Sequence, residues 1–224
     1  LMHRHAVGNP RARYRKDCSI EEVLASPVVS DPLHLLEICA VSDGAAALVL
    51  GTEEQARKRG GPLVRVAGCA AATGQFGDPA ARIPTVSQTL VPGIPHTSEV
   101  VGAVQRAMAQ AGVSHADVDL LEMADNTVWH VLAWPELFGF AQPGESDRLI
   151  ESGGYGLGGR LPINPSGGFL SFGEATTAQG VLQVCELAWQ LRGEATGRQV
   201  EGARVGLSAV LGLGANGASV VLTR

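Results

Sequence analysis

A layered α/β fold, in which helices cover both faces of a β-sheet, is the fold class that this sequence predicts. Segments of strand length alternate along the 224 residues with segments of helical periodicity, an order typical of layered α/β folds. Most of the expected strands are continuous apolar runs, which indicates a sheet that is buried on both faces. The chain contains 29 glycines, and small residues allow helices and strands to pack closely.

The first part of the chain is expected to be a connecting segment followed by two strands. Residues 1–42 predict a linker with one short helix at 19–25, begun by a capping box of a serine and a glutamate three residues apart. Apolar runs predict strands at 45–50 and 63–72, and a short polar helix at 53–59 separates them. A loop rich in glycine and proline follows at 73–94.

The clearest helix is predicted at 98–111. Its apolar residues recur at intervals of three and four, and Gly112 follows as a helix-ending residue. A third strand is expected at 118–123. The segment 127–138 is interpreted as a helix despite Pro135.

The last third of the chain predicts one long helix and a β-hairpin. A short helix at 145–151 and a glycine-rich loop at 153–168 lead to a helix at 176–191 with an apolar stripe on one side. Two apolar runs, 205–211 and 218–223, lie close enough in sequence to pair as antiparallel strands.

Composition and charge argue against several classes of function. The net charge of −5 and the pI near 5.7 give no general attraction to nucleic acid or to an anionic membrane. No apolar stretch reaches the roughly 18 residues that a membrane-spanning helix needs. The four cysteines lack C-x-x-C spacing, so we expect reduced thiols in a cytoplasmic protein. The six histidines do not cluster at metal-ligand spacing, and no metal site is predicted.

Two stretches match the dinucleotide-binding pattern G-x-G-x-x-G, at 154–159 and 212–217. That pattern binds a pyrophosphate only when a strand precedes it and a helix follows it. Neither stretch is followed by an expected helix, so both are interpreted as turns. A G-x-S-x-G elbow is also missing from the sequence, which argues against a serine hydrolase. His130, next to Trp129 on an apolar segment, is expected to be a satisfied buried or interface histidine.

The segment Asn-Pro-Ser-Gly-Gly at 164–168 and Glu174 after it form the most informative stretch. Glycines allow a backbone to pass close to a ligand or to another segment. Glu174 is expected at the N-terminus of the long helix, beside a glycine-walled cavity. An acidic residue there would also serve as a plain helix cap, which stabilises by roughly 0.3–1 kcal/mol whatever the function.

Four motifs occur in order along the chain: Val-Ser-Asp-Gly-Ala-Ala-Ala at 41–47, Asp-Leu-Leu-Glu at 119–122, Asn-Pro-Ser-Gly-Gly at 164–168, and the glycine loop at 212–217. The ordered set resembles the C-terminal half of thiolase-superfamily proteins of the lipid-transfer, or sterol-carrier-type, branch. The resemblance implies a thiolase-like layered αβαβα fold, in which this chain supplies a mixed β-sheet between helices.

The resemblance also divides the chain and implies a longer parent protein. Residues 1–42 would be the end of a loop domain, and 43–224 the C-terminal domain, split over 43–72 and 95–224 by the loop at 73–94. The nucleophilic cysteine of the family would lie in the other half, so none of the four cysteines here would have that role (Cys18, Cys39, Cys69 and Cys185). Family members are usually oligomers.

Three positions depart from the family pattern. Ala124 stands where the family has a His or Asn of an oxyanion hole, and Glu174 stands where it has the His of Gly-His-Pro. Val210 or Leu211 stands where it has an acid/base cysteine. Loss of one oxyanion donor typically costs about 10²–10³-fold in rate, so ordinary thiolysis or condensation is not expected. Retro-aldolases on this scaffold use tyrosines at the two His positions, and this chain has neither.

The resemblance implies an acyl-CoA-processing protein that uses a coenzyme A thioester as substrate and binds no cofactor. The reaction expected is cleavage of a C–C bond, as in steroid side-chain degradation, or a divergent acyl transfer. Glu174 would act as the base, assisted by Asp125 and Asn126. The residues expected to line the substrate site are Ala124, Ser166, Gly167, Gly168, Gly173, Leu211, Gly212 and Gly214.

Two alternatives lie outside this class of enzyme. The chain could be a catalytically silent subunit that binds acyl-CoA or lipid and pairs with an active partner, either a thiolase-like subunit or an OB-fold (DUF35-type) protein. It could also be a structural half of a larger fold whose site is completed by other residues. In either case homo- or hetero-oligomers are expected, with no nucleic-acid partner.

Overall fold

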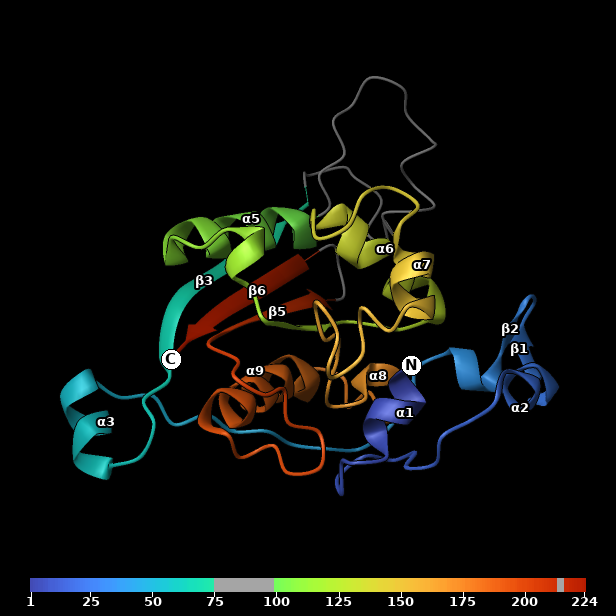
Figure 1. The fold of residues 1–224 in the computed structure, drawn as a ribbon, viewed down its shortest axis with the longest axis horizontal. Helices are drawn as coiled ribbons and strands as arrows, with labels where there is room; N and C mark the ends of the chain where they lie inside the picture. Colours follow the sequence, from blue (N-terminus) through green and yellow to red (C-terminus); the bar gives the residue numbers. More distant parts are fainter. Residues whose placement is uncertain (75–98, 213–215) are drawn as a thin grey trace.

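Helices lie on both sides of a four-stranded sheet in the computed structural model, which describes residues 1–74, 99–212 and 216–224. Figure 1 shows α5 (Glu99–Ala111) over one face of the sheet and α9 (Ala178–Arg192) under the other. The α/β class predicted from the alternating pattern is therefore confirmed. The two long helices lie within two residues of their predicted boundaries.

The sheet is mixed, with the strand order β3-β6-β5-β4. Its strands are β3 (Arg65–Thr73), β4 (Leu120–Met123), β5 (Val205–Gly212) and β6 (Asn216–Thr223). β6 pairs antiparallel with both β5 and β3, whereas β4 and β5 run parallel. The predicted hairpin at the end of the chain is confirmed. The parallel pair is made possible by the long crossover between β4 and β5, which includes α9.

Two apolar clusters, one on each face of the sheet, hold the layers together. On the α5 side, Val104 and Ala107 are fully buried in a cluster that also contains Leu121. On the α9 side, Leu187 packs in a second cluster with Leu120. Neighbouring residues of β4 thus face opposite clusters, as the pleat of a strand requires. The continuous apolar run of this strand is explained by burial of both faces.

β3 is only half buried, which differs from the prediction. Burial alternates along this edge strand, so that Cys69 is exposed while its neighbours Gly68 and Ala70 are buried. The buried face packs on α5, where Gly68 lies against the backbone of Ala107. α9 packs chiefly on β4, β5 and β6, and the other face of β3 therefore stays open.

The crossover between β4 and β5 contains three short helices before α9. They are α6 (Val128–Leu137), α7 (Ser146–Glu151) and α8 (Gly168–Ser171). The predictions at 127–138 and 145–151 are confirmed, and Pro135 is accommodated inside α6. The buried Trp134 ring donates its Nε1–H to the Ala124 carbonyl at 2.7 Å, which ties α6 to the end of β4.

The N-terminal segment contains more structure than a linker. α1 (Met2–Ala6) is buried and packs against α8, a helix that sequence patterns did not indicate. The helix predicted at 19–25 is confirmed as α2 (Ile20–Ala25), with the capping box of Ser19 and Glu22 formed. The hairpin β1 (Val28–Ser30) and β2 (Leu33–His34) and the 3-10 helix η1 (Leu35–Glu37) follow, and Figure 1 shows this small unit at the side of the sheet.

The strand predicted at 45–50 is wrong. Residues 42–52 form neither helix nor strand, and the Val49 side chain is 92% exposed. A strand is stabilised by hydrogen bonds to a neighbouring strand, and no described residue supplies that ladder here. The helix predicted after it is confirmed as α3 (Glu53–Arg59), which begins after the N-cap Thr52 and ends at Gly60. A further 3-10 helix, η2 (His115–Asp117), precedes β4.

The predicted loop at 73–94 falls largely outside the described residues, as does Gly214. The proposed boundary between 1–42 and 43–224 stays a prediction.

Candidate functional site

The turn at 164–168 is attached to the carboxyl end of β4. Asn164 makes this attachment from a left-handed backbone conformation, with φ of 47°. Its side-chain Oδ1 accepts from the Met123 amide at 2.6 Å, and its Nδ2 donates to the Met123 carbonyl at 3.1 Å. A carboxyamide side chain thus replaces a strand neighbour for the last residue of β4 and fixes where the turn lies.

The two glycines of this turn are required by their conformation and by a close approach. Gly167 and Gly168 have φ of 102° and 63°, a region that favours glycine. A Cβ on Gly168 would overlap both carboxyl oxygens of Asp125. The sequence-based expectation that glycines let this backbone pass close to a neighbour is confirmed: the neighbour of Gly168 is Asp125, and that of Gly167 is Ala6.

Asp125 is a completely buried carboxyl group beneath the turn. Its Oδ1 accepts from the Phe169 amide at 2.6 Å, and its Oδ2 has no hydrogen-bond partner among the described residues. Burial raises the pKa of Asp125 to about 8, against the opposing effect of the backbone hydrogen bonds. The carboxyl group is therefore mainly protonated at neutral pH and holds the start of α8.

Asp125→Asn is expected to flatten the pH dependence of stability. Between pH about 4 and about 8 the native carboxyl group holds a proton that the unfolded chain releases, so the free energy of unfolding falls as the pH rises through this window. The limit is about 1.4 kcal/mol per pH unit for one proton. Urea unfolding at pH 5 and pH 8 measures the difference. The amide removes the titration and can still accept from Phe169.

The exposed Asp147→Asn is the matched control, because its carboxyl group is already in solvent. It should keep the pH dependence of the parent protein. Equal pH slopes for the parent protein and Asp125→Asn would contradict the assignment of a buried, protonated carboxyl group.

Glu174 and Asn126 meet beside the turn. The Asn126 Nδ2 donates to the Glu174 Oε1 at 3.1 Å. Glu174 is partly exposed, and its backbone forms a parallel bridge with Val41, bonding on either side to Ala40 and Ser42. Two side chains expected to act together are therefore neighbours, although 48 residues separate them in the sequence.

The prediction that Glu174 lies at the helix N-terminus is wrong. α9 begins at Ala178 after Thr177, whose φ of 72° turns the chain into the helix. Glu174 lies before that turn, in extended backbone, and its carboxylate bonds to Asn126 rather than to a free amide of the helix. The alternative interpretation of this residue as a plain helix cap is thereby excluded.

Two residues beside Glu174 were not predicted to belong to the site. The Cys39 amide donates to the Asn126 carbonyl at 2.9 Å, and the Glu174 carboxylate raises the pKa of the Cys39 thiol. His130 is buried and accepts at Nδ1 from the Thr127 amide at 3.2 Å, as expected of a satisfied histidine. Burial lowers the pKa of His130, and the Glu174 charge acts in the opposite direction. No sequence pattern indicated either neighbour, since both lie far from Glu174 along the chain.

Ser166 of the turn is bound by the buried carboxyl group of Glu122. Its amide and its hydroxyl donate to Glu122 at 3.0 and 2.8 Å, and its carbonyl accepts from the Asn9 side chain at 2.8 Å. Burial raises the pKa of Glu122 well above its usual range, and the nearby Glu186 raises it further. Ser166, expected to contact substrate, thus has its amide, hydroxyl and carbonyl groups all engaged inside the protein.

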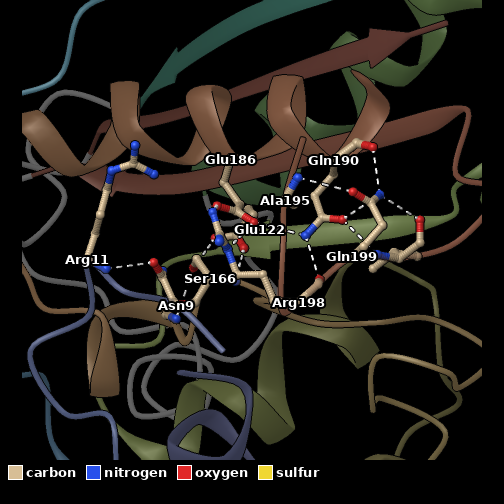
Figure 2. A network of polar contacts seen from close by, with 11 residues as sticks. Asn9, Arg11, Glu122, Ser166, Glu186, Gln190, Ala195, Arg198 and Gln199 are labelled. Atoms are coloured by element: carbon tan, nitrogen blue, oxygen red, sulfur yellow. Dashed lines mark hydrogen bonds and ion pairs between the residues drawn. The ribbon is translucent and has the colours of Figure 1, made fainter. Parts of the chain in front are cut away.

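A buried ion pair between Glu186 and Arg198 lies at α9. Figure 2 shows Glu186 on α9 and Arg198 from the following loop, with Glu122 and Ser166 alongside. Arg198 donates to both oxygens of Glu186, at 2.9 and 2.7 Å. The two side chains are buried, with 3% of Arg198 and 2% of Glu186 exposed. The Gln190 side-chain Nε2 donates to the same carboxylate at 2.9 Å. Glu186 of this group lies close enough to Glu122, which binds the turn at 164–168, for its charge to raise the pKa of Glu122.

The remaining predicted site residues are more dispersed. Ala124 is buried beside the turn, and its amide donates to the β5 carbonyl of Ala209 at 2.9 Å. Gly173, with φ of 120°, lies against the Ser42 side chain. Leu211 packs on the α5-side cluster and Gly212 is exposed at the end of β5. Gly173 directly precedes Glu174, and Ala124 lies two residues before Asn126, which binds Glu174, whereas Leu211 packs on the α5-side cluster.

Neither a metal-binding arrangement nor a membrane-spanning helix is found in the described part of the chain. Among residues 1–74, 99–212 and 216–224, no three His, Cys, Asp or Glu side chains gather as ligands of one ion. Within the same ranges, no helix has the length and apolar character needed to cross a bilayer.

A mixed sheet between helices, with a glycine turn fixed at the carboxyl end of one strand, fits the thiolase-like class of proteins. The chain belongs to the family of thiolase C-terminal domain-like proteins, whose model matches residues 89–224. It is 36% identical over 99% of its length to an acetyl-CoA acetyltransferase of Methanothermobacter thermautotrophicus. It is 35% identical over 98% of its length to sterol carrier protein 2 of Oryctolagus cuniculus. The recognition from ordered motifs is confirmed.

A solved structure described as an Ltp2–ChsH2(DUF35) aldolase superposes on the whole chain with a TM-score of 0.81 and 25% identity. The chain covers 56% of that structure, 55% of the acetyltransferase and 39% of the sterol carrier protein. It therefore spans about half the length of these relatives, or less.

Proposed function

We propose that this protein processes acyl-CoA by cleaving a C–C bond, in the manner of a retro-aldolase. The observation that carries the proposal is the contact between Glu174 and Asn126 beside the glycine turn. Glu174 is partly exposed, so its carboxylate is accessible as a base, and Asn126 fixes the position of one of its oxygens. General base catalysis needs this combination of access and orientation.

The proposed substrate is a β-hydroxyacyl thioester of coenzyme A, with no bound cofactor. Glu174 accepts the proton of the β-hydroxyl group, the new carbonyl forms, and the adjacent C–C bond breaks. Gly167, Gly168 and Gly173 are proposed to shape the acyl site, because their backbones pack directly against Ala6, Asp125 and Ser42, where a Cβ would not fit. The similarity to a structure described as an aldolase supports this reaction over thiolysis.

The proposal includes assembly with further thiolase-like subunits or with an OB-fold (DUF35-type) partner. Its support is that the similar aldolase structure carries a DUF35 component in its description. Ser42, which contacts Gly173 beside Glu174, is followed by the exposed stretch 43–52. The apolar side chains of this stretch are available for such a partner.

A second candidate is a silent acyl-CoA-binding subunit. The buried Ala124 cannot supply an oxyanion donor from its side chain, and the positions Val210 and Leu211 hold no acid or base. These losses favour binding without chemistry, in a complex whose partner carries the reactive groups.

The test is a pair of measurements on the purified protein with any subunit that co-purifies. Calorimetry measures binding of acetyl-CoA, and mass spectrometry follows a panel of β-hydroxyacyl-CoA and 3-ketoacyl-CoA esters. Release of a shorter acyl-CoA together with an aldehyde or ketone supports the lyase. Binding without turnover supports the silent subunit, and absence of acetyl-CoA binding overturns both.

A further inference from the structure

Cys39 is fixed next to the proposed base by a set of backbone hydrogen bonds. The Cys39 amide donates to the Asn126 carbonyl at 2.9 Å, and the following residue, Ala40, accepts from the Glu174 amide at 2.8 Å. The Ser42 amide then donates to the Glu174 carbonyl at 3.0 Å. Cys39 is therefore bonded to Asn126, and the residues that follow it, Ala40 and Ser42, are bonded to Glu174, all through main-chain groups.

The thiol of Cys39 belongs to the same group of side chains. It is partly exposed, and the Glu174 carboxylate lies close enough to raise the pKa of the thiol. The buried carboxyl group of Asp125 also acts on it, and Asp125 Oδ2 has no partner among the described residues. The thiol, the Glu174 carboxylate and the buried Asp125 carboxyl group therefore lie close enough to influence one another, and Asn126 binds Glu174 beside them.

The surroundings of Cys39 disfavour its nucleophilic thiolate form. Burial raises the pKa of the Cys39 thiol to about 12, and the hydrogen bond to Glu174 and its charge add to the effect. The thiolate is the nucleophilic form of cysteine, and it is scarce here at neutral pH. A thiol that keeps its proton beside a base can give that proton to a stronger base that forms during a reaction.

We propose that Cys39 is the acid that protonates the carbon released by C–C bond cleavage, with Glu174 restoring its proton. This inference rests on the proposed lyase function. It assigns the second proton transfer of that reaction to a residue for which neither the ordered motifs nor the relatives' descriptions suggest a role.

The proton balance of the step is complete within the pair. Glu174 takes the hydroxyl proton, the Cα–Cβ bond breaks, and its electron pair stays on Cα as the enolate of the shorter thioester. The Cys39 S–H donates its proton to Cα. The thiolate left behind is strongly basic and takes the proton from the neighbouring Glu174 carboxyl group, so both side chains return to their starting forms.

Alkylation of the thiols tests the pairing without any assay of activity. In the parent protein, iodoacetamide at pH 8 should modify Cys39 far more slowly than the exposed Cys69, as followed by peptide mass spectrometry. Glu174→Gln removes the charge beside the thiol and should speed modification of Cys39, by about tenfold for each unit by which its pKa falls, while Cys69 keeps its rate. Equal rates for the two cysteines in the parent protein would overturn the pairing.

Turnover and solvent exchange test the role. Cys39→Ser should lower kcat by about 10²-fold or more with little change in KM, and should slow incorporation of solvent deuterium at Cα of the shorter acyl-CoA. Cys69→Ala, in the exposed β3 thiol, is the control and should keep both rates. Cys39→Ala is a second variant for use where the serine does not fold.

The outcomes separate this inference from the proposed function. Full cleavage and exchange by Cys39→Ser would overturn the inference and leave the lyase intact. A parent protein that cleaves no β-hydroxyacyl-CoA would overturn the lyase itself, and with it this role.

Discussion

Arg198→Met is expected to lower the free energy of unfolding by about 3–5 kcal/mol, the usual effect of removing one partner of a buried ion pair. Arg198 donates two hydrogen bonds to Glu186, and the two side chains are 3% and 2% exposed. Glu122 is buried nearby, and burial together with the Glu186 charge raises its pKa. Without the guanidinium, two carboxyl groups remain in the interior with no cation.

Chemical or thermal unfolding measures this loss, and two further variants show its cause. Arg4→Met breaks an exposed ion pair with Asp17, whose side chains are 72% and 50% exposed, and should cost no more than about 1 kcal/mol. The double variant Glu186→Gln with Arg198→Met removes the unpaired charge and should recover part of the stability. A loss for Arg198→Met no larger than that for Arg4→Met would contradict the buried pair.

Arg198 also bears on the site, although it lies outside it. Arg198 neutralises Glu186, whose charge otherwise acts on the neighbouring Glu122, and Glu122 binds the amide and hydroxyl of Ser166. Loss of the arginine should therefore loosen the turn at 164–168 as well as α9. The position of the glycine turn thus depends on a buried charge pair as well as on its own sequence.

Glu174→Gln is expected to reduce turnover by about 10²–10⁴-fold, the range typical of a lost general base. The amide has nearly the shape of the carboxyl group, and its oxygen can still accept from Asn126 Nδ2, so the melting temperature should stay close to that of the parent protein. The measurements are kcat on the thioester that the screening panel identifies and thermal unfolding of the same preparation.

The matched control is Glu151→Gln, at the exposed end of α7, which should keep full activity. Retention of turnover by Glu174→Gln would exclude Glu174 as the base. A large fall in melting temperature would instead show that the contact with Asn126 is structural.

Much of the fold could be predicted because it is encoded in neighbouring residues. The apolar periodicity of α5, the alternation that ends in the hairpin β5–β6, and the capping box at Ser19 all depend on residues within a few positions of each other. The pattern at 164–168 likewise predicted a glycine turn correctly, since left-handed φ angles at Gly167 and Gly168 are a local property of the backbone.

The same local patterns failed where a partner decides the outcome. The run 45–50 has the composition of a strand, yet it forms no strand and is largely exposed, because the hydrogen bonds of a strand come from another segment. Glu174 looked like a helix cap in sequence, but the chain turns at Thr177 before α9 begins.

By itself, the sequence determined the α/β class, the order of its main helices and strands, the glycine turn, and the ordered motifs that mark the thiolase-like family. Only the tertiary structure decided that Cys39, Asn126 and Glu174 are neighbours, and that Arg198 neutralises Glu186 beneath the turn. The physical reason is that hydrogen bonds and charge effects act over a few ångströms of space. Which distant residues come within that range is set by the packing of helices on the sheet.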